Sequence, residues 1–441
     1  MVTERLPSVR SVALGFWIGV GSAGEHDSEA GISHLLEHML FRGTERYGSE
    51  EIDQIFDAMG AEINAGTDKE STSLYSRVID RHLDDAFDVM ADMVWRPRFG
   101  ELETEREVVL EEIAMYEDDP QDRVFDVLGR AIFGSHPLGR PVIGTREVIA
   151  AATREQLGDY HRTHYDPHSI VIAAAGSVEH DALVAMAREA QSRRGEGGSR
   201  PESGLSAATP AVSARTGQLA PAQLQRRVRF LAKDTEQYHV CLGGLGLARD
   251  DERRFALRVL EGVLGGTSSS RLFQEVRERR GLAYSVFCFS NLYASMGEVG
   301  IYVGTRPDNL RAALEVLATE LTRCVDDPAS EQELIRSREN LKGRMVLALE
   351  STGARMSRLG ASLLNGLPIL SVEEIIERID AVGVEQLREL AGELFALERL
   401  SVAGVGPDED SFNDAIEPLG GLVAAGAVGE AALAPGADGA P

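Results

Sequence analysis

The sequence predicts an α+β protein built from two duplicated α/β-sandwich domains. Short apolar segments with strand-like composition alternate with long amphipathic segments along the chain, which is the pattern of a mixed fold. The two halves also resemble each other, because HLLEHMLFRGT at 34–44 aligns with RVLEGVLGGT at 258–267. The strand-like segments that precede them, VALGFWIGVGS and YHVCLGGLGLA, match as well, which indicates an internal duplication.

The elements of the first copy follow from periodicity and from residues that end helices. The apolar segment 11–22 is expected to form a buried strand, and 29–40 the helix that follows it. The segment 49–60 predicts an amphipathic helix with Ser49 as its N-cap and Gly60 just past its C-terminus. The other elements expected here are strands at 61–66, 71–79 and 169–178, and helices at about 82–95, 101–117 and 120–133.

Composition divides the chain into four parts. Residues 1–193 are expected to form the first domain, and 226–405 the homologous second domain. Between them, 194–225 are rich in Gly, Ser, Pro and Ala, which predicts a flexible linker. The segment 406–441 ends in Ala, Gly and Pro and is expected to be a disordered tail.

The composition also excludes classes of protein. The 441 residues include 71 acidic and 45 basic side chains, and the net charge of −26 argues against nucleic acid as a partner. No apolar run is long enough for a membrane span, and the N-terminus lacks the apolar core of a signal peptide. The three cysteines are scattered and odd in number, which favours a reducing compartment. We therefore expect a cytoplasmic protein.

A group of titratable residues interrupts the apolar helix of the first copy. His34, Glu37 and His38 are spaced i, i+3 and i+4, so their side chains share one helix face. Burying such groups unpaired costs about 1–3 kcal/mol each, and a metal ion is the leading candidate for their partner. Two imidazoles at i and i+4 can each give zinc one nitrogen. The second copy has Arg258 and Gly262 at these positions, so only the first copy is expected to bind metal here.

Catalytic zinc usually takes three protein ligands and leaves one position for water, so a third ligand is expected elsewhere. The acidic helix at 101–117 offers Glu105 and Glu112, which lie two turns apart on one face. Glu111 points about 100° away around the helix and remains the alternative. Glu37 lies beside both histidines, which is the position of a general base that accepts a proton from zinc-bound water. The spacing H-x-x-E-H is the inverzincin signature.

Five segments carry a resemblance to a known family. They are HLLEHMLFRGT (34–44), MGAEINAGTDKEST (59–72), EREVVLEEIAMYEDDP (105–120), HPLGRPVIGT (136–145) and RLFQEVRERRGLAYSV (271–286). Together they resemble the pitrilysin/insulinase family of zinc peptidases, most closely the half-length branch that includes the mitochondrial processing peptidase β subunit and its bacterial relatives. The resemblance implies a clamshell of duplicated α+β domains around a closed chamber. It also implies an endopeptidase that hydrolyses unstructured peptides or processing segments.

The resemblance implies a role for each matching residue of the first copy. One zinc ion per chain would be bound by His34, His38 and Glu112, with Glu37 as the base. Glu105 matches the acidic residue that orients a zinc-bound histidine.

The resemblance also implies contacts with the peptide substrate. Asn64 and Ala65 match the edge strand along which an extended substrate lies. Arg277 and Tyr284 match a pair in the second copy that contacts the substrate and the transition-state oxyanion. Because one chain carries both sets of residues, a homodimer with two complete sites is expected.

The sequence leaves two other functions open. In non-catalytic scaffold subunits of the same fold, like the core subunits of a respiratory complex, the zinc ligands are commonly lost, whereas all are present here. A zinc hydrolase acting on a non-peptide bond is disfavoured by the edge-strand segment AEINAG, which suits an extended peptide backbone. Relatives usually begin with an extra strand, so either the chain starts upstream of Met1 or one sheet lacks an edge strand.

A second group of histidines could suggest another metal site. His161 and His164 lie at i, i+3, and His168 follows a proline that breaks the run. No acidic partner lies at helical spacing, so we expect these to be surface histidines at a helix end.

Overall fold

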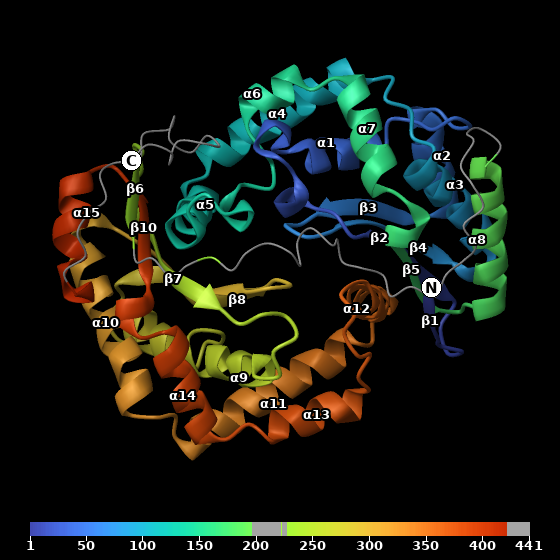
Figure 1. Cartoon of the computed structure of the whole chain (residues 1–441). Helices are drawn as coiled ribbons and strands as arrows, with labels where there is room; N and C mark the ends of the chain where they lie inside the picture. The colour runs from blue at the N-terminus through green and yellow to red at the C-terminus, as the bar shows by residue number, and fades with distance from the viewer. Residues whose placement is uncertain (196–221, 223–226, 421–441) are drawn as a thin grey trace. The chain divides into compact units, whose positions relative to one another are not determined.

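The computed structural model describes residues 1–195, 222 and 227–420 (Figure 1). Contacts between Cα atoms divide the chain into two compact units, and neither unit is one continuous segment. Among the described residues, unit 1 comprises 1–113, 141–195 and 347–369, and unit 2 comprises 114–140, 222, 227–346 and 370–420.

Unit 1 is built on a five-stranded sheet with strand order β1-β5-β2-β4-β3. β1 pairs in parallel with β5, and the other neighbouring strands pair antiparallel. The strands are β1 (Val2–Arg5), β2 (Ser11–Ile18), β3 (Glu62–Thr67), β4 (Thr72–Ile79) and β5 (Ile170–Gly176). The segments predicted as strands therefore are strands, and β1 supplies the edge strand whose presence the sequence left open.

The helices of the first copy cover one face of this sheet. Alternate residues of β2, including Leu14 and Phe16, are fully buried against apolar side chains such as Leu35 and Leu36. The residues between them, such as Ala13, are buried as well, because a helix from later in the chain packs on the other face of β2. The helices of the first copy are α1 (Ile32–Met39), α2 (Ser49–Met59), α3 (Leu83–Trp95), α4 (Leu102–Asp118), α6 (Arg146–Ala151), α7 (Arg154–His164) and α8 (His180–Gly195).

Two local predictions about helix ends in unit 1 need correction. Gly48, not Ser49, is the N-cap of α2, because Ser49 is already helical and its hydroxyl donates to Glu101 Oε1 at 2.9 Å. The prediction for Gly60 is confirmed, since it follows α2 with φ +61°, a conformation that favours glycine. His161 is buried rather than on the surface, and its Nε2 lies 2.8 Å from the carbonyl oxygen of Val94.

Unit 2 repeats the architecture of unit 1. Its sheet has the order β6-β10-β7-β9-β8, with β6 parallel to β10 and the other pairs antiparallel. The predicted duplication is confirmed by this identical topology. The strands are β6 (Val228–Ala232), β7 (Tyr238–Gly246), β8 (Ala283–Leu292), β9 (Gly297–Thr305) and β10 (Ser401–Gly406). The other helices of the second copy are α9 (Arg254–Leu264), α10 (Leu310–Asp326), α11 (Glu331–Ala348), α13 (Val372–Asp380) and α14 (Val384–Leu394).

The two copies exchange one helix each. α12 (Thr352–Leu364) comes late in the chain yet lies on the sheet of unit 1, as its orange ribbon beside the blue strands in Figure 1 shows. Its Met356 and Leu359 pack against alanines of β2 and β5. Conversely, α5 (Pro120–Phe133) precedes the predicted boundary at 193 but packs on β7 and β10 of unit 2. A single boundary in sequence therefore does not separate the two compact units.

The end of the described chain differs from the predicted tail. α15 (Glu409–Ala415) follows β10 and buries Phe412 completely, so 407–420 are ordered and the prediction of disorder is wrong for them. The helix begins where the Asp408 carboxylate accepts a hydrogen bond from the backbone N–H of Ser411 at 2.8 Å. Most of the predicted linker, and 421–441 of the predicted tail, lie outside the described residues.

The expectations about membrane spans and about the cysteines can be compared with the described residues. None of the helices described combines the length and the apolar character needed to cross a lipid bilayer. The three cysteines, Cys241, Cys288 and Cys324, are all free thiols.

Candidate metal centre

α1 begins at a tightly packed turn that fixes the direction of its side chains. Gly31 precedes the helix with φ +96°, and a Cβ there would lie 2.7 Å from the carbonyl oxygen of Ile143. The buried carboxylate of Glu25 accepts hydrogen bonds from the backbone N–H groups of Gly31 at 2.9 Å and Ser33 at 2.8 Å. A carboxylate at a helix N-terminus stabilises the helix, so the start of α1 is held directly before His34, and His38 follows His34 by one turn.

The structure brings two histidines of α1 and one glutamate of α4 together. His34 Nε2 lies 3.6 Å and His38 Nε2 3.4 Å from Glu112 Oε2. One ligand atom from each of the three residues lies within 4.8 Å of the other two. Among the residues that the structure describes, this is the one group of three or more His, Cys, Asp or Glu side chains with such proximity. Glu111, the alternative third ligand, is exposed and is not part of the group.

The separations within this group fit a tetrahedral zinc ion. Two nitrogen or oxygen ligands at about 2.0–2.1 Å from zinc lie ~3.3 Å apart when they occupy tetrahedral positions. The distances of 3.4 and 3.6 Å from the imidazole nitrogens to Glu112 are close to this value. Two imidazoles and one carboxylate also form a ligand set that is known in catalytic zinc sites.

A second carboxylate holds His38 from its other side. Glu105 is 2% exposed at its side chain, and His38 Nδ1 lies 2.8 Å from its Oε1. Arg42 Nε donates to the second oxygen of the same carboxylate. When Nδ1 donates to Glu105, Nε2 is left with a lone pair directed towards Glu112, which is how outer carboxylates orient metal-bound histidines.

Burial and charge give the two histidines different pKa values. Burial, with a smaller contribution from His38, lowers the pKa of His34 to about 4, so this imidazole is neutral at pH 7. Burial also lowers the pKa of His38, but hydrogen bonds with Glu105 and Glu112 outweigh it and raise the value to about 9. The hydrogen bond with His38 lowers the pKa of Glu112. Binding of a metal ion through His38 Nε2 therefore requires loss of the His38 proton.

Glu37 lies on the same face of α1 but makes a separate contact. Its Oε2 accepts a hydrogen bond from Thr67 Oγ1 at 2.6 Å, at the end of β3. Burial raises the pKa of Glu37, although the Thr67 hydrogen bond opposes the shift. A carboxylate with a raised pKa accepts protons more readily near neutral pH, as a general base requires.

Thr67 and Arg42 also belong to this site, although neither was predicted from the sequence. Arg42 lies just past the end of α1, so helical spacing alone does not indicate its contact with Glu105. Thr67 follows the predicted substrate strand, but nothing in its local sequence indicates contact with Glu37 across 30 residues.

Asn64 and Ala65 lie on β3, which is at the end of the strand order in unit 1. Among the described residues β3 pairs only with β4, so its other edge offers unpaired backbone groups. The Asn64 side-chain oxygen accepts a hydrogen bond from the backbone N–H of Ala65 at 2.8 Å. The strand runs from these residues to Thr67, and therefore towards Glu37.

Arg277 and Tyr284 belong to unit 2 and lie beside each other. Arg277 Nη1 donates to the carbonyl oxygen of Tyr284 at 3.1 Å, and its guanidinium lies 4.3 Å from the centre of the Tyr284 ring. Tyr284 is 78% exposed. The pair therefore presents a cation and a phenol on the surface of its own unit.

In unit 2, the position equivalent to the metal group is packed against another helix. A Cβ on Gly262 would lie 2.2 Å from the hydroxyl oxygen of Ser337 in α11, so no larger side chain fits there without rearrangement. Arg258, which replaces His34, pairs with Glu261 at 3.1 Å. That only the first copy binds metal at this position stays a prediction.

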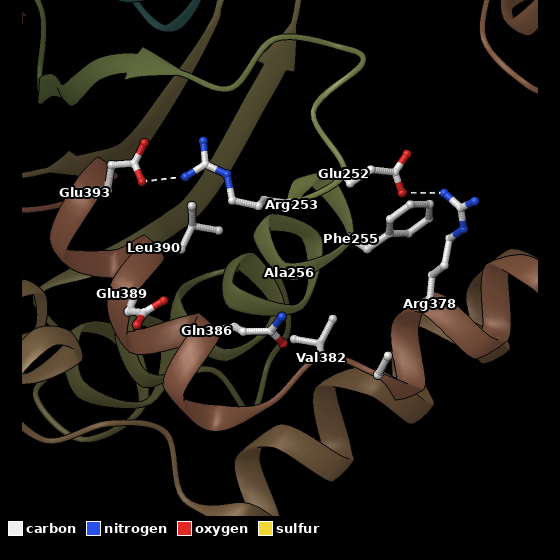
Figure 2. Close-up of a pocket in the computed structure, with 11 residues that line it drawn as sticks. Glu252, Arg253, Phe255, Ala256, Arg378, Val382, Gln386, Glu389, Leu390 and Glu393 are labelled. Carbon is white, nitrogen blue, oxygen red and sulfur yellow. Dashed lines mark hydrogen bonds and ion pairs between the residues drawn. The ribbon is translucent and has the colours of Figure 1, made fainter.

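Unit 2 also contains a cavity of about 340 Å³ beside α9, α13 and α14 (Figure 2). Its floor is apolar, with Phe255 and Leu390, and two ion pairs lie at its edge, Glu252 with Arg378 and Glu393 with Arg253 (Figure 2). None of the residues predicted to be functional lines this cavity.

Comparison with known proteins identifies the family of this chain. Residues 1–146 match the model of insulinase, peptidase family M16, and 151–341 match the peptidase M16 inactive domain. An uncharacterized zinc protease of Streptomyces coelicolor is 41% identical over 93% of this chain and 88% of its own length. The chain belongs to peptidase family M16. A further relative of this M16 chain, the uncharacterized zinc protease YmxG of Bacillus subtilis, is 39% identical over 92% of the chain and 96% of its own length.

Solved structures share the fold of this M16 chain. A protease from Helicobacter pylori and a peptidase M16 inactive domain from Pseudomonas fluorescens each superpose with a TM-score of 0.82 at 21% identity. Each comparison covers 92% of this chain and 96% of the other. The family assignment and these superpositions confirm the predicted resemblance and fold class.

Proposed function

We propose that this M16 chain is a zinc-dependent endopeptidase that binds one zinc ion per chain. The observation that carries the proposal is the convergence of His34, His38 and Glu112 beside Glu37. Relatives at 39–42% identity are named zinc proteases, which supports the same metal and the same reaction class here. A zinc ion at this position would act as a Lewis acid and lower the pKa of a bound water towards about 7.

The protein groups around this position have distinct tasks in the proposed reaction. Glu37 takes a proton from the attacking water and passes it to the leaving amine of the cleaved peptide bond. Thr67 fixes the Glu37 carboxylate through its 2.6 Å hydrogen bond. Glu105 and Arg42 keep the imidazole of His38 in the orientation that binds metal.

The proposed substrates are unstructured peptides or processing segments. The free edge of β3 can accept an extended peptide as an additional strand, with Asn64 and Ala65 among the residues that pair with it. A folded protein cannot offer such a segment without local unfolding. Following the family resemblance, we propose that cleavage takes place in a closed chamber and that Arg277 and Tyr284 contact the substrate and the transition-state oxyanion.

Metal removal and readdition tests this function directly. The purified protein should cleave unfolded peptides of tens of residues, lose this activity on chelation and regain it with about one equivalent of zinc. A compact, thermostable protein should not be cleaved at internal sites. If zinc binds at one equivalent but no peptide is cleaved, the alternative of a non-catalytic scaffold subunit replaces the peptidase proposal.

We also propose that the active form is a homodimer. One chain carries both the zinc-binding set in unit 1 and the Arg277–Tyr284 pair in unit 2, so self-association can complete two sites by closed symmetry. Mixing a Glu37→Gln chain with an Arg277→Ala chain should restore activity towards half per mixed dimer, because one of its two sites is intact. Confirmed subunit exchange without recovered activity, or a monomer in light scattering at working concentration, contradicts the homodimer.

A further inference from the structure

A cavity of about 420 Å³ lies in unit 1 beside the edge strand β3. It opens on the sheet face that α12 covers, opposite the face that packs on α1 and α3. α12 contacts β1, β5 and β2, but β4 and β3 extend beyond it on this face. The lining residues that matter here are Glu62 and Asn64 of β3, Tyr75 and Arg77 of β4, and Met356 of α12.

Tyr75 is unusually accessible for an aromatic residue in the middle of a sheet. It is 38% exposed, and it lies opposite Asn64 in the β3–β4 pairing. The next β3 residue on the same face is Gly66, where an added Cβ would meet nothing within 4 Å. The Tyr75 ring is therefore uncovered, because neither neighbouring residue of β3 can cover it. The Asn64 side chain is short, and Gly66 has no side chain.

The second copy shows what fills the corresponding position. When the aligned strands β2 and β7 are matched, Gly15 corresponds to Cys241, and their partners Tyr75 and Tyr302 correspond to each other. Asn64 then corresponds to Phe287, which lies opposite Tyr302.

By the same register, Gly66 corresponds to Phe289. The Phe287 ring stacks on Tyr302 at 4.9 Å and 28°, and Phe125 of α5 lies 5.2 Å from Phe289 and 5.8 Å from Tyr302. These rings leave Tyr302 only 1% exposed. The same sheet position is thus filled by aromatic rings in unit 2 and hollow in unit 1.

We propose that the hollow over Asn64, Gly66 and Tyr75 is a subsite for an aromatic side chain of the peptide substrate. The proposal rests on the proposed peptidase function, because the peptide must pair with the free edge of β3. An added strand would lie ~4.8 Å from β3 and therefore ~10 Å from β4. Since Asn64 and Gly66 leave the space above β3 open, an aromatic side chain of the peptide can lean across β3 and contact the Tyr75 ring.

The position of the subsite along the peptide follows from strand geometry. Gly66 and Asn64 lie one and three residues from Thr67, whose hydroxyl contacts Glu37. A peptide residue facing this hollow is therefore within about four residues of the scissile bond, at ~3.3 Å per residue. The charged groups at the opening, Glu62 and Arg77, pair with each other at 2.6 Å, so they add no net charge that would favour an acidic or basic side chain.

Peptide libraries randomised at the four positions on each side of the scissile bond test the subsite. The zinc-loaded wild type should select an aromatic residue at one of these positions. Tyr75→Ala should remove that preference and raise KM for the aromatic peptide about threefold to tenfold, with kcat little changed, as expected for loss of an aromatic pair. Tyr75→Phe should retain the preference, because it keeps the ring.

Two further variants make the result specific. Asn64→Phe copies the residue of unit 2, so it should fill the hollow and remove the aromatic preference. Ile79→Ala is the matched control, because Ile79 is 40% exposed on the same face of β4 but does not line the cavity. The cleavage profile of this variant should equal that of the wild type.

Two results would overturn the subsite alone. They are an aromatic preference that survives in folded Tyr75→Ala, and an active wild type without any aromatic preference. A wild type that cuts no peptide overturns the peptidase proposal and the subsite with it.

Discussion

Glu37→Gln should abolish peptide hydrolysis while the protein retains its zinc. The glutamine has nearly the same shape as the glutamate and leaves His34, His38 and Glu112 in place, so metal content should stay near one ion per chain. It cannot accept the proton of the attacking water, however, and loss of a positioned base lowers rates by at least ~10²–10⁴-fold. Burial raises the pKa of the Glu37 carboxylate, which helps it to accept a proton, and the glutamine amide does not titrate.

The measurement combines turnover of an unfolded peptide with metal analysis of the same sample. Thr67→Val provides the comparison, because it deletes only the hydrogen bond to Glu37 and leaves the carboxylate in place. It should therefore reduce kcat much less than Glu37→Gln does. Near-normal turnover by Glu37→Gln at full zinc occupancy would show that another group is the base.

Glu112→Gln should lower zinc affinity and activity together, whereas Glu111→Gln should change neither. Glu112 Oε2 faces both imidazole nitrogens at 3.4 and 3.6 Å, so its replacement removes the only carboxylate of the proposed ligand set. Glu111 is its neighbour on the same helix with the same charge, but it is exposed and outside the group, which makes it the matched control.

Glu105→Gln should give an intermediate result. Glu105 contacts His38 at Nδ1 rather than the metal position, and loss of such an orienting partner typically costs about 10–100-fold in metal affinity. Zinc titration against a competing chelator would rank the three variants as Glu112→Gln weakest, Glu105→Gln intermediate and Glu111→Gln unchanged. Loss of zinc from Glu111→Gln with retention in Glu112→Gln would assign the third ligand to Glu111.

Chain-local patterns were sufficient for much of the metal group. His34, Glu37 and His38 share a face because of the 3.6-residue period of the helix, and this holds in any fold that keeps the helix. Glu105 and Glu112 share a face of α4 for the same reason. The structure places both beside His38, one at each ring nitrogen.

Other features depended on partners distant in sequence. Ser49 has the composition of an N-cap, but Gly48 takes that position while the Ser49 hydroxyl donates to Glu101. Phe412 orders a segment whose surroundings are poor in large apolar residues, because α15 packs on β6, β10 and α10. Composition averaged over a window does not register a few buried anchors such as Phe412, Ile416 and Leu419.

The amino-acid sequence alone predicts a duplicated α+β chain whose first copy carries two histidines and a glutamate at H-x-x-E-H spacing. These properties rest on hydrophobic periodicity and internal repetition, which can be recognised in the sequence without knowledge of tertiary contacts. The packing of α5 and α12 on the sheet of the other copy, and the exposure of Tyr75 where Tyr302 is buried, are visible only in the folded chain. Helix exchange and the filling of a sheet face depend on which apolar surfaces meet after the chain has folded. Helices and strands with the same local pattern can satisfy that requirement in more than one arrangement, so the pattern does not select among them.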